Sequence, residues 1–223
     1  MTDTKKVVIT GGNSGIGLAL AQKLLAENYE VIITSRSGHV EGFTHPQLTV
    51  VQLEITDFDS IKAATEQISK LTDKIDILVN NAGIAPDVFE VIPAADIFVQ
   101  TMNVNVTGLV FFAEALLTHI ADGGQVINVS TDMALLSQAQ PNGPAYRMSK
   151  AAVNMYTKML SQRLKERNIR VTAIHPGWVR TKLGGDQAPM DTASAASGIY
   201  KVIDETVYTG EFNNAYTGDR FFL

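Results

Sequence analysis

The chain has 223 residues, a mass of 24.1 kDa, 45% hydrophobic residues and 18% charged residues, which is the size and composition of one globular domain with a substantial core. Its formal net charge is -5 and the sequence has no basic run, so we expect neither nucleic acid nor a membrane surface as a partner. The absence of cysteine excludes disulfides, thiolate zinc sites, iron–sulfur clusters and a cysteine nucleophile.

The first residues lack the apolar stretch of a secretory signal, and no apolar run approaches the roughly 20 residues that span a bilayer. We therefore expect a soluble, cytoplasmic protein. The histidines are scattered without a ligand motif, which argues against a bound metal and favours structural or surface roles for His39, His45, His119 and His175.

Short, nearly continuous apolar segments alternate with helix-length segments along the chain. The former are typical of strands buried on both faces, and they cover Val7–Thr10, Val31–Ser35, Leu48–Leu53, Asp76–Gly83, Gln125–Ser130 and Arg170–Gly177. The expected helices cover Gly15–Asn28, Ser60–Leu71, Ala94–Ala121 and Ala145–Arg167. This alternation predicts an α/β fold with a doubly wound, Rossmann-like parallel sheet, built as a single domain over residues 1–223.

Two segments depart from that alternation. Between Arg36 and Leu48 the sequence contains two glycines and a proline, so we expect a loop or a single turn there instead of a helix. After Gly177 the sequence becomes irregular, and it then predicts a last helix at about Thr192–Glu205 and a terminal strand near Asp219–Leu223.

A glycine-rich loop follows the first expected strand and leads into an amphipathic helix. Glycines let the backbone approach a pyrophosphate, and the start of a helix offers unpaired N–H groups and the positive end of its dipole. The spacing T-G-x-x-x-G-x-G at a strand–helix junction therefore predicts a dinucleotide site formed by Gly11, Asn13, Ser14, Gly15, Ile16 and Gly17.

Tyr146 and Lys150 lie on one face of an expected helix, with their side-chain bases about 5 to 6 Å apart. A nearby ammonium favours the phenolate, so we expect Lys150 to lower the pKa of Tyr146 from its usual value of about 10. The pair predicts a general acid for carbonyl reduction. A second hydroxyl at the end of the preceding strand should orient the carbonyl, with Thr131 as the first choice and Ser130 as the alternative.

The end of the second expected strand, Thr34-Ser35-Arg36, bears on the choice of cofactor. NAD sites usually place a carboxylate here for the adenosine ribose, and Ser35 stands in that position. Arg36 follows, and a guanidinium can bind a 2′-phosphate through two hydrogen bonds. We therefore expect NADP(H) as the preferred cofactor and NAD(H) as a second option, although a solvated surface charge is an equal interpretation of Arg36 alone.

In their order and spacing these motifs resemble the short-chain dehydrogenase/reductase family, and within it the carbonyl reductases of the sniffer and C-signal type. The resemblance covers nearly the whole chain and rests on the glycine loop, Asn80-Asn81-Ala82-Gly83, Asn105 in NVNVTG, Tyr146-x-x-x-Lys150, and Pro176-Gly177 with Thr181. It implies that Asn105 bends its helix and holds a water that supplies protons to Lys150, and that Thr181 holds the nicotinamide carboxamide.

The resemblance also implies a wider set of cofactor contacts, and the sequence departs from the family at two points. The implied contacts are Glu54, Ile55, Asn81, Ala82, Gly83, Tyr146, Lys150, Pro176, Gly177, Val179 and Thr181. Thr131 stands where the family usually has the catalytic serine, and Glu54 replaces the aspartate that the family usually offers to adenine. The serine-to-threonine change keeps a hydroxyl, so it does not exclude activity.

Together these observations predict an NADP(H)-dependent carbonyl reductase that transfers hydride between nicotinamide and a small carbonyl or secondary-alcohol substrate. Two other classes stay open: a non-catalytic nucleotide-binding regulatory protein on the same fold, and an epimerase that uses bound NAD(P). The trio of Asn105, Tyr146 and Lys150 argues against the first, and the short region after Gly177 argues against the second.

Two of the expected helices are more apolar than one contact with a sheet requires. The helix from Tyr146 carries two apolar stripes, and the helix from Ala94 is apolar almost all round. We therefore expect a homodimer or a homotetramer that forms through these helices.

Overall fold

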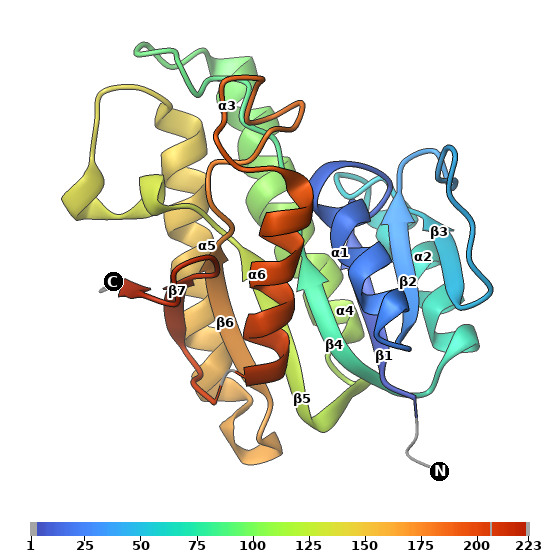
Figure 1. The fold of residues 1–223 in the computed structure, drawn as a ribbon. Coiled ribbons are helices and arrows are strands. Elements are labelled where there is room, and N and C mark those ends of the chain that lie inside the picture. Colours follow the sequence, from blue (N-terminus) through green and yellow to red (C-terminus); the bar gives the residue numbers. More distant parts are fainter. Residues whose placement is uncertain (1–3, 206, 222–223) are drawn as a thin grey trace.

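The computed structural model describes residues 4–205 and 207–221, and in them eight strands form one sheet (Figure 1). The strands are β1 (Lys6–Thr10), β2 (Glu30–Ser35), β3 (Leu48–Gln52), β4 (Ile75–Asn80), β5 (Ile120–Val129), β6 (Arg170–His175), β7 (Glu211–Asn214) and β8 (Arg220–Phe221). The α-helices are α1 (Gly15–Ala26), α2 (Phe58–Leu71), α3 (Ala95–Met102), α4 (Leu109–Leu116), α5 (Pro144–Arg163) and α6 (Thr192–Glu205).

The sheet has the strand order β3-β2-β1-β4-β5-β6-β7-β8. Its neighbours pair in parallel from β3 to β7, and β8 joins the edge antiparallel to β7. The chain winds outward from β1 to β3 and then returns to the other side of β1 as β4. Ligands of such sheets bind outside the carboxyl ends of the strands at this point of reversal. The expected doubly wound α/β fold is confirmed.

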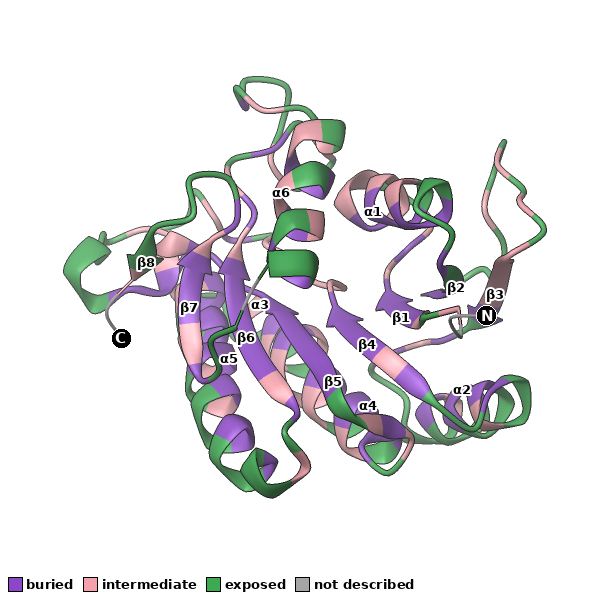
Figure 2. Cartoon of the chain, turned by 60° about the horizontal axis from the view of Figure 1, so that its bottom comes forward, coloured by how far each residue is buried: buried purple, intermediate pink, exposed green. Residues whose placement is uncertain are grey.

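Helices cover both faces of the sheet. In Figure 1, α1 and α6 lie in front of the strands, and α2, α4 and α5 lie behind them. Leu24 of α1 and Ile199 of α6 belong to the apolar core on the first face, and Phe112 of α4 and Leu160 of α5 belong to the core on the second. Figure 2 shows the result: the central strands are mostly buried, whereas the edge strands and one side of each outer helix are more exposed.

The prediction of one continuous helix over Ala94–Ala121 is wrong, because the helical segment is interrupted and ends earlier. It consists of α3, one π-helical turn at Asn103–Gly108, and α4. The π turn inserts the polar residues Asn103, Asn105 and Thr107 between two apolar segments, and the chain already enters β5 at Ile120. The apolar periodicity could not reveal either change.

The carboxyl-terminal region also differs from the expectation. The sequence analysis missed β7, because its sequence EFNN contributes only two buried residues, Phe212 and Asn213. The expected terminal strand is present as β8, which is shorter, and residues 222–223 lie outside the described part. Residues 36–47 form turns and loop without a helix, as predicted. No helix in the described ranges is long and apolar enough to cross a membrane.

Candidate active site

A cavity of about 1000 Å³ opens at the carboxyl ends of the central strands. Nearly all the residues that the sequence analysis selected line it: Gly11, Asn13, Ser14, Gly15, Ile16, Ser35, Arg36, Glu54, Ile55, Asn81, Ala82, Gly83, Ser130, Thr131, Tyr146, Lys150, Pro176, Gly177, Val179 and Thr181. Gly17 and Asn105 are the two exceptions among the selected residues, and both are buried behind the wall.

The glycine loop is tied to the end of β4 by four hydrogen bonds. The Thr10 hydroxyl accepts from the backbone N–H groups of Asn81 and Ala82, each at 3.0 Å. The Asn81 amide donates back to the carbonyls of Thr10 and Gly11, at 2.9 and 3.2 Å. Asn81 therefore holds the loop in place in addition to lining the cavity.

The start of α1 has the properties of an anion site. Ser14 is the N-cap of α1 but its side chain makes no capping hydrogen bond, so the first N–H groups of the helix are not satisfied by it. A Cβ at Gly17 would lie 2.4 Å from the Gly11 carbonyl oxygen, so this close approach requires glycine. The exposed N–H groups and the helix dipole fit a pyrophosphate at this point.

The end of β2 forms the far side of the cavity. Ser35 is buried and donates to the carbonyl of His39 at 3.3 Å. Arg36 is exposed, and its guanidinium has no hydrogen bond or ion pair with another described residue. The Glu54 carboxylate instead accepts from the N–H and hydroxyl groups of Thr56, at 3.2 and 2.8 Å. Arg36 thus has a free guanidinium at the wall, whereas Glu54 is engaged within its own turn.

Lys150 is buried at the centre of the cavity wall. Its ammonium donates to the Val129 carbonyl at 2.8 Å, and burial lowers the pKa of Lys150 to about 8. A Cβ at Gly83 would lie 3.3 Å from the Lys150 nitrogen and 3.2 Å from Asn105 Oδ1, so the backbone of Gly83 passes close to both side chains. The Asn105 side chain pairs with both backbone groups of Ile84, each at 2.8 Å, within the π turn.

Tyr146 and Thr131 form a pair of hydroxyl groups in the same wall. Burial raises the pKa of Tyr146 to about 12, and the Thr131 hydroxyl opposes that rise. The expectation that Lys150 lowers this pKa is not met, because the desolvation of the phenol dominates. Ser130 is directed elsewhere, since its hydroxyl donates to the Lys150 carbonyl at 3.4 Å.

The first turn of α5, which carries Tyr146, is held by a buried carboxylate. Asp87 Oδ2 accepts from the Ala145 N–H at 2.6 Å, and Asp87 Oδ1 accepts from the Tyr146 N–H at 3.3 Å. Arg147 leaves the same turn on its other side and donates to the carbonyls of Met133, Gln138 and Asn142 at 2.7 to 3.1 Å. The loops at both sides of the cavity mouth are thereby fixed to α5.

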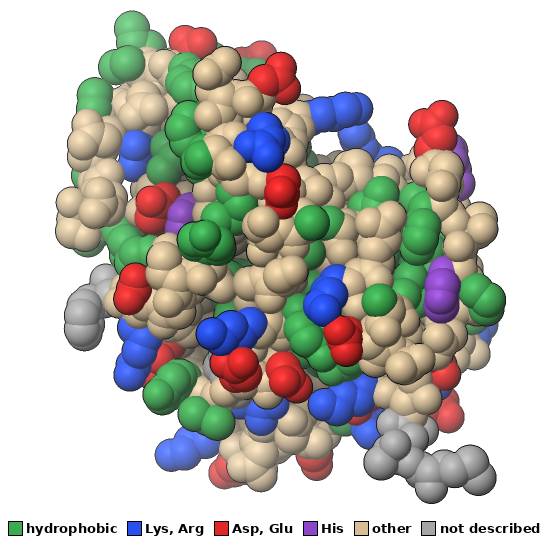
Figure 3. All heavy atoms as spheres, viewed as in Figure 1, with side chains coloured by type: hydrophobic (Ala, Val, Ile, Leu, Met, Phe, Trp, Pro, Cys, Tyr) green, Lys and Arg blue, Asp and Glu red, His purple; other side chains and the backbone are tan. Residues whose placement is uncertain are grey.

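Apolar side chains form the mouth of the cavity: Val88, Phe89, Met133, Trp178 and Leu183. Figure 3 shows hydrophobic side chains gathered at the upper left of the molecule, over the loops that contain residues 85–94 and 178–190 in Figure 1. Trp178 is half exposed, and its ring N–H donates to the Gly184 carbonyl at 2.8 Å. The mouth therefore suits a substrate with an apolar part.

Sequence reasoning missed Asp87, Asp132 and Arg147, and it placed His175 among the structural or surface histidines. That view of His175 is incomplete, because the side chain lines the cavity at the carboxyl end of β6. Its position directly before Pro176 was the signal that could have identified it. Asp87 gave no such signal, since its partner Ala145 on α5 is 58 positions further along the sequence. The described residues contain no cluster of three metal-ligating side chains.

Comparison with known proteins identifies relatives of the whole arrangement. Residues 5–192 match the family model described as short chain dehydrogenase. A 3-oxoacyl-[acyl-carrier-protein] reductase of Chlamydia pneumoniae is 29% identical over 188 residues, which cover 80% of this chain and 75% of the relative.

Solved structures give the same result. Carbonyl reductase Sniffer of D. melanogaster superposes with a TM-score of 0.89 at 25% identity and covers 98% of this chain and 99% of its own. An NADPH-bound carbonyl reductase from chicken fatty liver superposes with a TM-score of 0.89 at 29% identity, with 99% and 95% coverage. The resemblance to the family and to its sniffer-type carbonyl reductases is confirmed.

Replacing Asp87 tests whether its carboxylate stabilises the start of α5. Asp87→Ala removes the acceptor of two N–H groups, and α5 has no other side-chain cap, so we expect a loss of about 1 to 2 kcal/mol of unfolding free energy. Hydrogen exchange at residues 145–148 should also become faster.

Asp57→Ala is the matched control, because Asp57 caps α2 with the same chemistry at 2.9 Å. It should destabilise the protein similarly without affecting exchange at α5. Equal exchange at residues 145–148 in both variants would refute the role assigned to Asp87.

Proposed function

We propose a reaction for this chain, which belongs to the short-chain dehydrogenase family of oxidoreductases: the NADP(H)-dependent interconversion of a small carbonyl compound and the corresponding alcohol. The observation that carries the proposal is the hydroxyl pair of Tyr146 and Thr131, buried in the cavity wall beside Lys150. A general acid, an orienting hydroxyl and a buried cation are the groups that carbonyl reduction requires.

In this proposal the side chains handle the proton. Bound nicotinamide would supply the hydride that forms the new C–H bond. Tyr146 gives its proton to the carbonyl oxygen, because a pKa of about 12 keeps the phenol protonated at neutral pH. Lys150, whose pKa is about 8, is mostly charged at pH 7 and stabilises the phenolate that remains. A solvent proton then restores Tyr146, so one hydride and one proton are added in each turnover.

The cofactor assignment rests on two features of the cavity, the glycine loop and Arg36. The glycine loop and the start of α1 suit a pyrophosphate, and the free guanidinium of Arg36 suits a 2′-phosphate. The NADPH found in the chicken carbonyl reductase supports this preference. NAD(H) remains a second option, since nothing at Ser35 or the glycine loop excludes it.

The apolar side chains at the mouth of the cavity indicate the substrate class. Its apolar wall of Val88, Phe89, Met133, Trp178 and Leu183 favours aldehydes and ketones with an apolar substituent. The two alternatives, a regulatory nucleotide-binding protein and an epimerase, gain no support from the site. A binding module has no use for a buried tyrosine beside a hydroxyl and a lysine.

Replacing Tyr146 tests the reaction. Tyr146→Phe removes the proton donor and keeps the ring, so we expect NADPH to bind with unchanged affinity while turnover falls by roughly 10² to 10⁴. The measurement is the loss of NADPH absorbance with a panel of apolar aldehydes and ketones.

Tyr216→Phe is the control, because it removes one phenol oxygen from an exposed residue away from the cavity. If Tyr146→Phe turns over as fast as this control, Tyr146 is not the general acid. If the wild-type protein reduces none of the panel, the proposed reaction itself is wrong.

Replacing Arg36 tests the cofactor preference. Arg36→Ala should weaken NADPH binding by about 1.5 to 3 kcal/mol, the contribution of charged hydrogen bonds, and should leave the NADH dissociation constant nearly unchanged. Calorimetric titration of the protein with each cofactor measures both constants. Ser35→Asp should reverse the preference, since a carboxylate repels the phosphate and accepts from a ribose hydroxyl. Equal weakening of both cofactors by Arg36→Ala would mean that the arginine only shapes its loop.

We also propose that the chain forms a homodimer or homotetramer through α4 and α5. Phe111 on α4 and Met155 and Met159 on α5 are between 50% and 61% exposed, although their helices pack on the sheet with their other faces. Exposed side chains of this size on two neighbouring helices are typical of a covered surface.

A charge on this surface should therefore separate the subunits. Met155→Asp is expected to shift the mass measured by light scattering to that of a monomer, without loss of secondary structure. Leu71→Asp is the control, because Leu71 is similarly apolar and exposed at the end of α2. An unchanged mass for Met155→Asp would place the interface elsewhere.

A further inference from the structure

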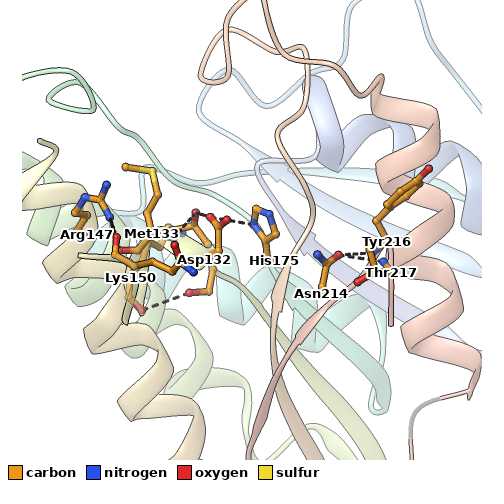
Figure 4. A network of polar contacts seen from close by, with 11 residues as sticks. Asp132, Met133, Arg147, Lys150, His175, Asn214, Tyr216 and Thr217 are labelled. Carbon is orange, nitrogen blue, oxygen red and sulfur yellow. Dashed lines mark hydrogen bonds and ion pairs between the residues drawn. The ribbon is translucent and has the colours of Figure 1, made fainter. Parts of the chain in front are cut away.

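Asp132 and His175 point toward one another in the cavity wall near Lys150 (Figure 4). Thr131 and Tyr146 line the same cavity, and the Thr131 hydroxyl lowers the pKa of the Tyr146 phenol. The Thr131 hydroxyl also donates to Asp132 Oδ1 at 3.2 Å, and Asp132 Oδ1 lies 3.9 Å from His175 Nδ1. Neither Asp132 nor His175 has a part in the proposed reaction so far.

The Thr131 hydroxyl has one proton and two acceptors that compete for it. Thr131 caps the 3-10 turn Asp132–Ala134, where its oxygen accepts from the Met133 N–H at 3.3 Å. A proton donated to Asp132 cannot at the same time stabilise a Tyr146 phenolate or a substrate carbonyl. The carboxylate thus decides which way the hydroxyl points. Asp132 also raises the pKa of Tyr146 through its negative charge.

His175 lies behind the carboxylate. Its Nδ1 is buried without a hydrogen-bond partner among the described residues, and its ring packs edge-on against Phe221 of β8. Burial lowers the pKa of His175, and the neighbouring Asp132 opposes that effect. Among the described residues, Asp132 is the one charged group that shifts this pKa.

The other charged groups near Tyr146 come from its own helix and from the loop after β4. Lys150 lies one turn further along α5, and Asp87 binds the N–H groups of the first turn. Arg147 is directed away, toward the carbonyls of Met133, Gln138 and Asn142. Asp132 is therefore the carboxylate that reaches the Tyr146 hydroxyl through a side chain.

We propose that Asp132, whose carboxylate lies 3.9 Å from His175 Nδ1, is a positioning residue. Its carboxylate accepts a hydrogen bond from the Thr131 hydroxyl and so fixes the direction of that hydroxyl beside Tyr146. This inference rests on the proposed function. With the carboxylate in place, Thr131 acts as an acceptor toward the phenol, which holds Tyr146 in the protonated form that carbonyl reduction uses. Without it, Thr131 turns to donate to the phenolate, which favours alcohol oxidation.

The test follows the ionisation of Tyr146 in the NADP⁺-bound protein, by the carbon NMR signal of tyrosine labelled at Cζ. Tyr146→Phe identifies the signal among the six tyrosines. Asp132→Asn should lower the titration midpoint by about one pH unit, the usual effect of one nearby charge and hydrogen bond. Asp73→Asn, with the same loss of charge at an exposed turn before β4, should leave the midpoint unchanged. An unchanged midpoint in Asp132→Asn would overturn the proposal.

A double-mutant cycle separates positioning from charge alone. If Asp132 acts through Thr131, the shift caused by Asp132→Asn should fall to less than half in a Thr131→Val background. A shift of full size in that background means that Asp132 acts across space, and the proposal is wrong. Thr131→Ser keeps the hydroxyl and should restore the full shift.

The pairing with His175 has its own readout. Asp132→Asn should lower the midpoint of the His175 ring signal, which His175→Gln identifies among the four histidines. No change there would remove His175 from the proposal. None of these titrations depends on turnover, so they succeed or fail separately from the search for a substrate. With an active substrate, Asp132→Asn should also move the alkaline limb of the reduction rate to lower pH.

Discussion

The parallel register of β4, β5 and β6 is the constraint on which the candidate site depends. It places Asn80 beside Asn128, and Asn128 beside Ala173, at the same level of the sheet. Gly83 and Thr131 follow β4 and β5, and His175 ends β6, so residues far apart in sequence reach one cavity wall. A shift of one residue in any of these pairs would turn the strand faces over and separate the hydroxyl of Thr131 from the phenol of Tyr146.

The same register supports α5 through a buried chain of amides. Asn80 donates to Asn128 at 2.8 Å, and Asn128 donates to the Thr157 hydroxyl at 2.8 Å. Thr157 in turn donates to the Val153 carbonyl within α5. Buried polar groups are costly when they are unpaired, so the hydrogen bonds of Asn128 and Thr157 favour one position of the helix, although Asn80 Oδ1 itself has no partner among the described residues. This chain of hydrogen bonds therefore helps to fix α5, with Tyr146 and Lys150, against the strand ends. The contacts of Asp87 with the first turn of α5 add to this effect.

Burial has opposite effects on the pKa values of Tyr146 and Lys150. The pKa of Tyr146 rises to about 12 and the pKa of Lys150 falls to about 8, because the surroundings disfavour both charged forms. In the proposed reaction, the Lys150 ammonium would stabilise the phenolate that Tyr146 leaves after giving up its proton.

The sequence contained most of the fold and of the nucleotide side of the cavity. Buried parallel strands require continuous apolar runs, and the glycine loop lies within one short segment, so both features are local. The features that could not be predicted depend on contacts between distant segments. The polar strand β7 forms because β6 offers it an edge, and the π turn at Asn105 forms because its side chain binds the backbone of Ile84. Neither condition is visible in periodicity.

The two halves of the cavity are built on separate supports, which bears on how the substrate range of such a chain could change. The glycine loop is anchored to β4 through Asn81, whereas the mouth segments that contain Asp87 and Met133 are anchored to α5 through Asp87 and Arg147. The halves meet at Gly83, which has Lys150 and Asn105 on either side. Among the described residues, the hydrogen bonds that anchor the glycine loop to β4 come from Thr10 and Asn81, so Phe89 and Met133 can vary in size without breaking them. In the proposed function, substrate preference and cofactor binding are thus physically separable, and the hydroxyl groups of Thr131, after β5, and Tyr146, on α5, are the part that both would share.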